Sequence, residues 1–269
     1  MRKIETIQEL QKIEYDILCS TIDFFEENDI RYLLCGGTML GAVRHNGFIP
    51  WDDDIDVLVP REDYEKLKGL RDVFDHQNIK LRIPGDENYP FPFIKVVNTQ
   101  TILRSAAENS RFPSHIWIDI FPLDHFPDNK IAHMIELAKN KVLRGALHTE
   151  ILTNGPAHGG KLMKLALTLV NKMLGGYQKI AVKMDLCAKA MNDRNIHSKH
   201  YGDGAWPNYV KDYFDDYMIF PFVKHMFVDR EFNIPKNYDA YLTRFYGDYM
   251  TPPSKEHQIT HCFDAYWIE

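Results

Sequence analysis

An acidic run that leads into an apolar strand constrains this chain more than any other feature. Residues 52–54 are all aspartates, and Asp56 follows within the apolar stretch Ile55–Pro60. Carboxylates this close repel one another unless water, a cation or protonation relieves them. Side chains two apart on a strand point to the same face. We therefore expect Asp54 and Asp56 to project together, while the apolar residues of the strand pack on the other side.

Two carboxylates on one strand face suit Mg²⁺, with Mn²⁺ as an alternative, because such a cation binds oxygen ligands and leaves positions for substrate phosphates. A third metal-binding and catalytic carboxylate is expected from a neighbouring strand. Asp119 is the candidate, because apolar residues surround it and a buried charge needs a role. A calcium loop does not fit, since its sixth and twelfth positions, counted from Asp52, hold Val57 and Asp63. A solvated acidic turn is the remaining alternative.

A glycine pair upstream is the second half of the expected site. Gly36-Gly37 precedes Thr38, near which we expect a helix to begin and to end around residues 45–47. Glycine lets the backbone approach phosphate oxygens, and a helix N-terminus favours anions. Arg44 is a candidate partner for phosphate or for an aspartate, and His45 a hydrogen-bond donor or a surface residue.

The remaining pattern predicts an α+β fold with a small mixed sheet flanked by helices. Apolar spacing predicts a long helix over residues 4–28, and helical patterns dominate from residue 129 to 199. We expect one catalytic domain, 1–269, with a core over 1–127 and a helical, aromatic-rich elaboration over 128–269. Strands are expected near residues 31–35, 55–60, 93–97, 101–104 and 115–121, the last ended by Pro122.

Charge and cysteine content exclude several classes of protein. The net charge of −6 argues against a nucleic-acid binder, which usually carries a basic stripe. The four cysteines form no CxxC pair, so zinc is not expected and a reducing compartment is. The N-terminus has no apolar signal region, and no apolar run reaches the roughly 18 residues of a membrane span. We therefore expect a cytoplasmic protein.

The stretch from Gly36 to Asp56, GGTMLGAVRHNGFIPWDDDID, resembles the signature of the LicD family, and residues 244–253 resemble its C-terminal block. These are bacterial phosphocholine transferases, distantly related to the fukutin-type ribitol-phosphate transferases. The resemblance implies a nucleotidyltransferase fold. Its pattern of glycines, an Asp-x-Asp pair and a third acidic residue falls on Gly36, Gly37, Asp54, Asp56 and Asp119.

The resemblance also implies a reaction. Phosphocholine would pass from CDP-choline to a sugar hydroxyl of a cell-surface glycan precursor, lipid-linked and of teichoic acid or lipopolysaccharide type, and CMP would leave. Asp54 and Asp56 would hold Mg²⁺, and Asp119 would complete the metal shell or accept the hydroxyl proton. Phosphoethanolamine or ribitol phosphate could be transferred instead. A nucleotide-sugar glycosyltransferase with an Asp-x-Asp site and a non-catalytic binding protein are the rival classes.

Several further residues are candidates for substrate binding. Lys95, mid-strand among apolar residues, would contact phosphate or face solvent. A choline group would be held by aromatic faces. Trp51 beside the acidic run is one candidate, and the aromatic group Tyr201, Trp206, Tyr209, Tyr213, Phe214 and Tyr217 is another, which could equally be core.

The segment Lys161–Leu174 is apolar with three lysines. It is too short to cross a bilayer, but it could lie in a membrane interface or pack as core. If this segment does not pack in the core, we expect it to contact the inner face of the membrane peripherally.

Overall fold

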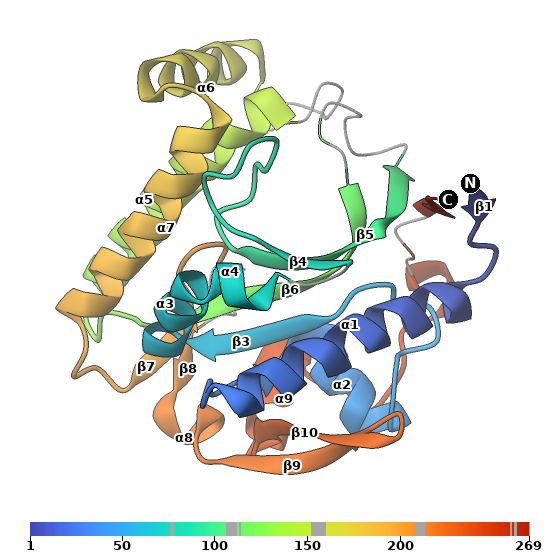
Figure 1. The fold of residues 1–269 in the computed structure, drawn as a ribbon. Helices are drawn as coiled ribbons and strands as arrows, with labels where there is room; N and C mark the ends of the chain where they lie inside the picture. Colours follow the sequence, from blue (N-terminus) through green and yellow to red (C-terminus); the bar gives the residue numbers. More distant parts are fainter. Residues whose placement is uncertain are drawn as a thin grey trace.

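The computed structural model describes residues 1–269 except 76–77, 106–111, 113, 152–159, 208–212, 259, 261–262 and 269. Within the described part, nine strands form one mixed sheet with the central order β1-β11-β5-β6-β3-β2 (Figure 1). The α+β class expected from the sequence is confirmed. The strands of this sheet are β1 (Arg2–Lys3), β2 (Leu33–Leu34), β3 (Asp56–Pro60), β4 (Ile79–Arg82), β5 (Ile94–Ser105), β6 (Ser114–His125), β7 (His200–Asp203), β8 (Phe214–Asp215) and β11 (Phe263–Trp267).

Helices cover the sheet, and a separate hairpin lies below it in Figure 1. The hairpin consists of β9 (Phe222–Phe227) and β10 (Arg230–Pro235), which pair antiparallel. The helices are α1 (Ile7–Glu27), α2 (Gly36–His45), α3 (Arg61–Gly69), α4 (Arg71–Phe74), α5 (Lys130–Ile151), α6 (Gly160–Leu174), α7 (Tyr177–Arg194), α8 (Asp216–Ile219) and α9 (Tyr238–Tyr246), with a 3-10 turn η2 at Lys255–His257.

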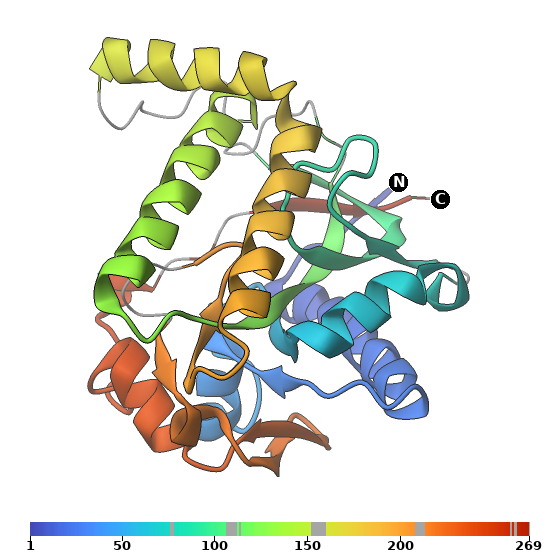
Figure 2. The same ribbon diagram turned by 90° about the vertical axis from the view of Figure 1, so that its left-hand side faces the viewer.

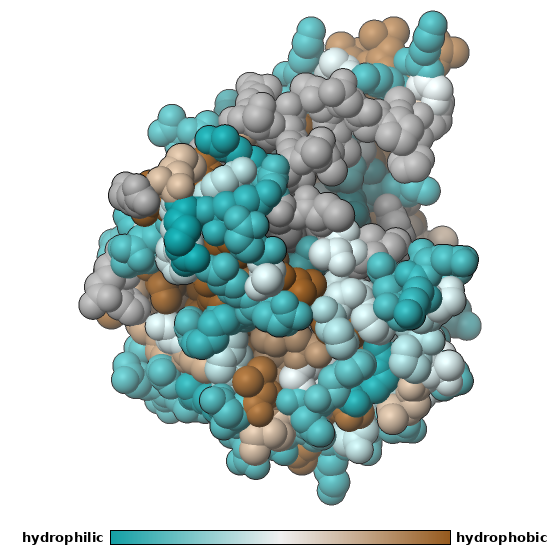
Figure 3. Space-filling model, turned by 90° about the vertical axis from the view of Figure 1, so that its right-hand side faces the viewer, coloured by the Kyte–Doolittle hydropathy of each residue, from teal (hydrophilic) through white to brown (hydrophobic). Residues whose placement is uncertain are grey.

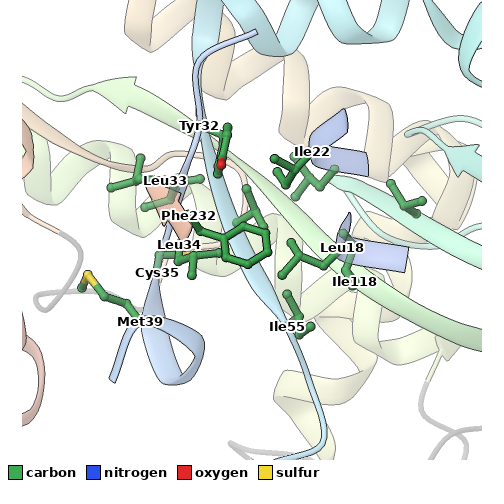
Figure 4. Close-up of a cluster of buried hydrophobic side chains, with 14 of the residues drawn as sticks. Leu18, Ile22, Tyr32, Leu33, Leu34, Cys35, Met39, Ile55, Ile118 and Phe232 are labelled. Carbon is green, nitrogen blue, oxygen red and sulfur yellow. The ribbon is translucent and has the colours of Figure 1, made fainter. Parts of the chain in front are cut away.

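The main core lies between α1 and the sheet. Thr6 caps α1 by accepting a hydrogen bond from the Glu9 N–H at 3.2 Å. The apolar side of this helix, including Leu18 and Ile22, packs on Ile55 and Ile118 of the sheet region (Figure 4). The apolar spacing that predicted the helix is the reason for this packing. Because Ile55 and Ile118 face the core, their neighbours Asp56 and Asp119 face the opposite side of the sheet.

The longest sheet strands differ from the sequence expectation. Residues 93–97 and 101–104 belong to one strand, β5, with a register shift between Asn98 and Leu103. Strand β6 does not end at Pro122 but continues to His125. On the edge away from β3, Pro122 lies after Ile120, the last residue paired with β5, and before Leu123, the first paired with β7. A strand tolerates proline where no ladder hydrogen bond is required.

The segment from 130 to 194 forms a helical assembly. Helices α5 and α7 run side by side, and α6 lies across one end of the pair (Figure 2). They share a small apolar core that includes Leu147, Ile180 and Met184. Strands β7, β8 and β11, which follow this assembly in the chain, pair with the same sheet as β3 and β6. In the described part of the chain, no helix is long and apolar enough to cross a membrane.

Candidate active site

Three charged side chains lie in one row across neighbouring strands. Asp56 of β3 pairs in register with Asp119 of β6, and Asp119 pairs in register with Lys95 of β5. Lys95 Nζ lies 2.9 Å from Asp119 Oδ1, and both side chains are largely buried. The third carboxylate expected from a neighbouring strand is therefore placed beside the Asp-x-Asp motif. Its role remains a prediction.

Lys95 does not face solvent, because aromatic rings enclose it. Its ammonium lies 3.8 Å from the ring centroid of Trp117 and 4.4 Å from that of Phe91, with Phe93 at 5.6 Å. Cation–π attraction and the ion pair to Asp119 together hold a buried cation in place. The sequence signal was available, since Phe93 precedes Lys95 by two residues and Trp117 precedes Asp119 by two on β6.

Gly36 and Gly37 allow two carboxylates to approach the backbone closely, and they do not form an open loop. Gly36 has φ +53° and opens α2, two residues earlier than expected from Thr38. A Cβ on Gly36 would lie 2.8 Å from Asp56 Oδ2, and one on Gly37 would lie 2.6 Å from Asp52 Oδ2. The space that these glycines leave is therefore filled by the protein's own acidic side chains. Asp52 joins the site in this way, although only Asp54, Asp56 and Asp119 were expected.

Thr38 fixes the strand that carries Asp56. Its hydroxyl oxygen accepts a hydrogen bond from the Asp56 backbone N–H at 2.8 Å. Cys35 supplies no side-chain cap to α2, so the first-turn N–H groups of this helix rely on other acceptors. Anions at this helix end are favoured by the helix dipole. The carboxylates of Asp52 and Asp56 lie there.

Burial and mutual repulsion disfavour the ionised forms of the buried carboxylates. Burial, followed by the charges of Asp54, Asp119 and Asp52, raises the pKa of Asp56 well above its usual range, and Lys95 only partly opposes this. Burial also raises the pKa of Asp119, while the Lys95 ammonium lowers it. Groups of this kind gain most from a cation that shares their charge.

A buried glutamate on α1 was missed by sequence reasoning. Glu14 is 3% exposed, and its Oε2 has no hydrogen-bond partner among the described residues. Burial, and then the charges of Asp54, Asp53 and Asp52, raise its pKa well above the usual range. One turn earlier, the Gln11 amide donates to the Asp52 carbonyl at 2.8 Å. In the sequence, Gln11 and Glu14 are recognisable only as neighbours on one helix face. That spacing does not show that they lie beside the acidic run about 40 residues later.

Arg44 and His45 are held by neighbours at the end of α2. The Arg44 guanidinium donates to the Tyr249 carbonyl at 2.7 Å and to His45 Nδ1 at 3.4 Å. Burial, and then the Arg44 charge, lower the pKa of His45, which favours the neutral ring. The Trp51 ring lies edge-on to His45, with centroids 6.4 Å apart. These three residues therefore line one side of the acidic run, with Arg44 tied to the C-terminal segment.

That C-terminal segment also reaches the acidic groups. Burial, and then the charges of Asp56 and Asp52, raise the pKa of Tyr246 well above its usual range. Tyr246 ends α9, and the Tyr249 carbonyl holds Arg44. The two sequence blocks, residues 36–56 and 244–253, are thus brought together by the fold.

The aromatic group proposed as a choline cage does not form one cage. Phe214 stacks on Tyr241, Tyr213 stacks on His200, and Trp206 contacts Phe93. Tyr217 is exposed, Tyr201 packs on Phe220, and Tyr209 lies outside the described residues. Phe214 is therefore a core residue, as the alternative interpretation of this group predicted.

The oxygen atoms of the acidic residues suit a hard divalent cation such as Mg²⁺. Asp52, Asp54, Asp56 and Asp119 offer only oxygen atoms, the ligand type that Mg²⁺ prefers. Within the described residues, no three His, Cys, Asp or Glu side chains are already arranged as a metal site. One carboxylate oxygen of Asp119 is already engaged in the ion pair with Lys95.

Comparison with known proteins finds relatives of one family. Residues 29–143 match the model of the LicD/FKTN/FKRP nucleotidyltransferase domain, which includes Asp54, Asp56, Lys95 and Asp119. The chain is 29% identical to the lipopolysaccharide cholinephosphotransferase LicD of Haemophilus influenzae over 99% of both chains. Residues 29–143 therefore form a domain of the LicD family. The chain is also 42% identical to the ribitol 5-phosphate transferase FKRP of Mus musculus, over 41% of this chain and 20% of that protein.

The match to the LicD family confirms two expectations. The resemblance read from residues 36–56 is correct, and the chain is an enzyme of the phosphotransferase class. The matched residues of the LicD-family domain end at 143, inside α5. Helices α6 and α7 therefore lie outside the matched domain.

Proposed function

We propose that this protein transfers phosphocholine from CDP-choline to a sugar hydroxyl of a cell-surface glycan precursor and releases CMP. One observation carries the proposal: the row of Asp56, Asp119 and Lys95 stands in a chain that matches a lipopolysaccharide cholinephosphotransferase over its full length. The acceptor would be a lipid-linked precursor of lipopolysaccharide or teichoic acid. The match to FKRP supports transfer of a phosphate-linked alcohol more generally and makes CDP-ribitol the second donor to test.

The acidic residues would hold the cation of this reaction. Asp54 and Asp56 would bind Mg²⁺, with Asp52 beside them over Gly37. A bound Mg²⁺ would offset charge on the diphosphate and on the departing CMP. The raised pKa of Asp56 agrees with a site that is incomplete without a cation.

The remaining residues would orient the reactants and move one proton. The acceptor oxygen would form a bond to the choline-bearing phosphorus as the bond from that phosphorus to the CMP oxygen breaks. Asp119, whose ionised form the Lys95 ammonium favours, would accept the hydroxyl proton. The first turn of α2 would face the donor phosphates, and Arg44 would add positive charge from the other side of the acidic run.

A thermal-shift panel tests the donor and the metal site together. The protein is heated with Mg²⁺ and, in turn, CDP-choline, CDP-ethanolamine, CDP-ribitol and UDP-glucose. A ligand present at about 100 times its Kd stabilises the folded state by roughly 2.7 kcal/mol. We expect the largest Mg²⁺-dependent shift with CDP-choline, lost in Asp54→Ala and kept in the control Asp72→Ala, whose side chain is exposed on α4.

Release of CMP with a glycan acceptor then tests the transfer itself. A shift with CDP-ribitol alone would change the donor, and a shift with UDP-glucose alone would favour the glycosyltransferase alternative. Normal turnover of Asp54→Ala in saturating Mg²⁺ would refute the metal assignment.

A further inference from the structure

Helix α6 has three distinct faces. The first packs on the protein: Val170 and Leu174 contact the small core shared with α5 and α7, and the Asn171 amide donates to the Ala146 carbonyl at 3.0 Å. Asn171 is the single buried residue of the helix. The interpretation of Lys161–Leu174 as core is therefore wrong for most of its apolar residues.

The second face is apolar and turned away from the protein. Leu162, Leu165, Leu169 and Met173 are 84%, 68%, 59% and 78% exposed. Their spacing of three or four residues places them in one stripe along the helix. Figure 2 shows α6 projecting beyond α5 and α7, and the uppermost atoms in Figure 3, over the same region, include brown hydrophobic groups among teal ones. A contiguous exposed apolar stripe of this kind marks an interaction surface.

The third face is positively charged. Lys161, Lys164 and Lys172 lie on the side of the helix between the stripe and the protein-facing residues. Residues 160–174 contain no aspartate or glutamate, although the whole chain has a net charge of −6. The positive charge is therefore local to this helix and borders its apolar stripe.

We propose that α6 docks this protein on an anionic lipid surface, with the apolar stripe inserted at the interface and the lysines at the headgroups. Lysines beside an apolar stripe are the composition of helices that lie in the plane of a membrane. At 15 residues the helix is about 22 Å long, short of the roughly 30 Å hydrocarbon layer, so it would lie on the membrane rather than cross it.

Charge favours a lipid surface over a second copy of this chain. Two α6 helices packed stripe to stripe would bring two sets of lysines together without an acidic partner on either helix. Anionic headgroups supply the opposite charge. The docking does not depend on the transfer chemistry proposed above, since none of the acidic-site residues lies on α6.

Co-sedimentation of the full chain with lipid vesicles tests the proposal. We expect binding to vesicles that contain phosphatidylglycerol and little binding to phosphatidylcholine alone. The triple variant Leu162→Ser, Leu165→Ser, Met173→Ser should lose binding. A matched control, Val73→Ser, Ile131→Ser, Leu186→Ser, removes three exposed apolar side chains from α4, α5 and α7 and should bind as the wild type does.

A charge variant tests the lysines separately. Lys161→Gln, Lys164→Gln, Lys172→Gln should weaken binding to phosphatidylglycerol vesicles by roughly 100-fold, because each basic residue near an anionic surface contributes a factor of about five. Absence of wild-type binding, or equal binding by the triple serine variant, would overturn the proposal. A dimer in light scattering that the serine variant dissociates, without vesicle binding, would overturn it in favour of a second copy.

Discussion

The carboxylate of Asp56 lies directly over the bare Cα of Gly36, so that a Cβ on Gly36 would come 2.8 Å from Asp56 Oδ2. Gly36 also has φ +53°, where residues with side chains are strained. Gly36 thus satisfies two requirements. It adopts a left-handed backbone conformation at the first residue of α2, and it leaves room for a carboxylate of the proposed metal site.

Gly36→Ala should therefore impair both stability and activity. The left-handed backbone costs about 1–2 kcal/mol for a residue with a Cβ, and displacement of Asp56 should lower CMP release at least tenfold. Urea unfolding and the transfer assay check the two effects. Gly69→Ala is the control, since no described atom lies within 4 Å of its Cβ position. Equal activity of the two variants would contradict the placement of Asp56.

Lys95→Gln should shift the pH dependence of the reaction. The Lys95 ammonium lowers the pKa of Asp119, which burial otherwise raises, so its loss raises that pKa further. If Asp119 acts as a base, it must be ionised, and the acidic limb of the pH–rate profile should move to higher pH. Lys80→Gln, an exposed lysine on β4, should leave the profile unchanged. An unmoved limb in Lys95→Gln would argue against Asp119 as the base.

Glu14→Gln should stabilise the metal-free protein at neutral pH. The pKa of Glu14 in the folded state is raised well above 4.5, so its contribution to stability is fully present below about pH 4.5 and is lost as pH rises through the raised pKa. Glutamine does not ionise and avoids this loss. The melting temperature of the variant should exceed that of the wild type by a margin that grows from about pH 5 to pH 8.

Glu27→Gln, at the exposed end of α1, is the matched control, because it makes the same substitution on the same helix away from the acidic run. A margin for Glu14→Gln that is constant with pH would mean that the carboxyl group is not the source of the effect.

Asp124→Ala should destabilise the fold without touching the proposed chemistry. Asp124 is fully buried and receives two hydrogen bonds from Arg61, at 2.6 and 2.8 Å, and Arg61 also binds Asp185 of α7 at 2.7 Å. Removal of one partner leaves a buried charge poorly compensated, which costs about 3 kcal/mol. In urea unfolding, Glu62→Ala, which removes an exposed ion pair with Arg31, should cost less than about 1 kcal/mol. Equal losses of unfolding free energy in the two variants would show that the buried ion pairs do not stabilise the packing of α7 on the sheet.

Much of the local structure could be predicted from the sequence. The long first helix, the acidic strand and the end of α2 around residues 45–47 follow from spacing and from residue types that depend only on neighbours along the chain. The continuation of β6 through Pro122 could not be predicted, because it depends on which strands lie beside that proline. For the same reason the sequence does not show that Asp124, two residues after Pro122, is a buried strand residue.

The acidic strand, the glycine pair and the family signature can be recognised in the sequence, because each consists of consecutive residues. Three other relationships depend on the fold: Lys95 pairs with Asp119, Asp52 lies over Gly37, and the charges of the acidic run raise the pKa of Glu14. Strand order and register set these contacts, and neither is encoded in any one segment. The exposure of α6 was decided in the same way, since the apolar pattern of a helix does not state what will cover it.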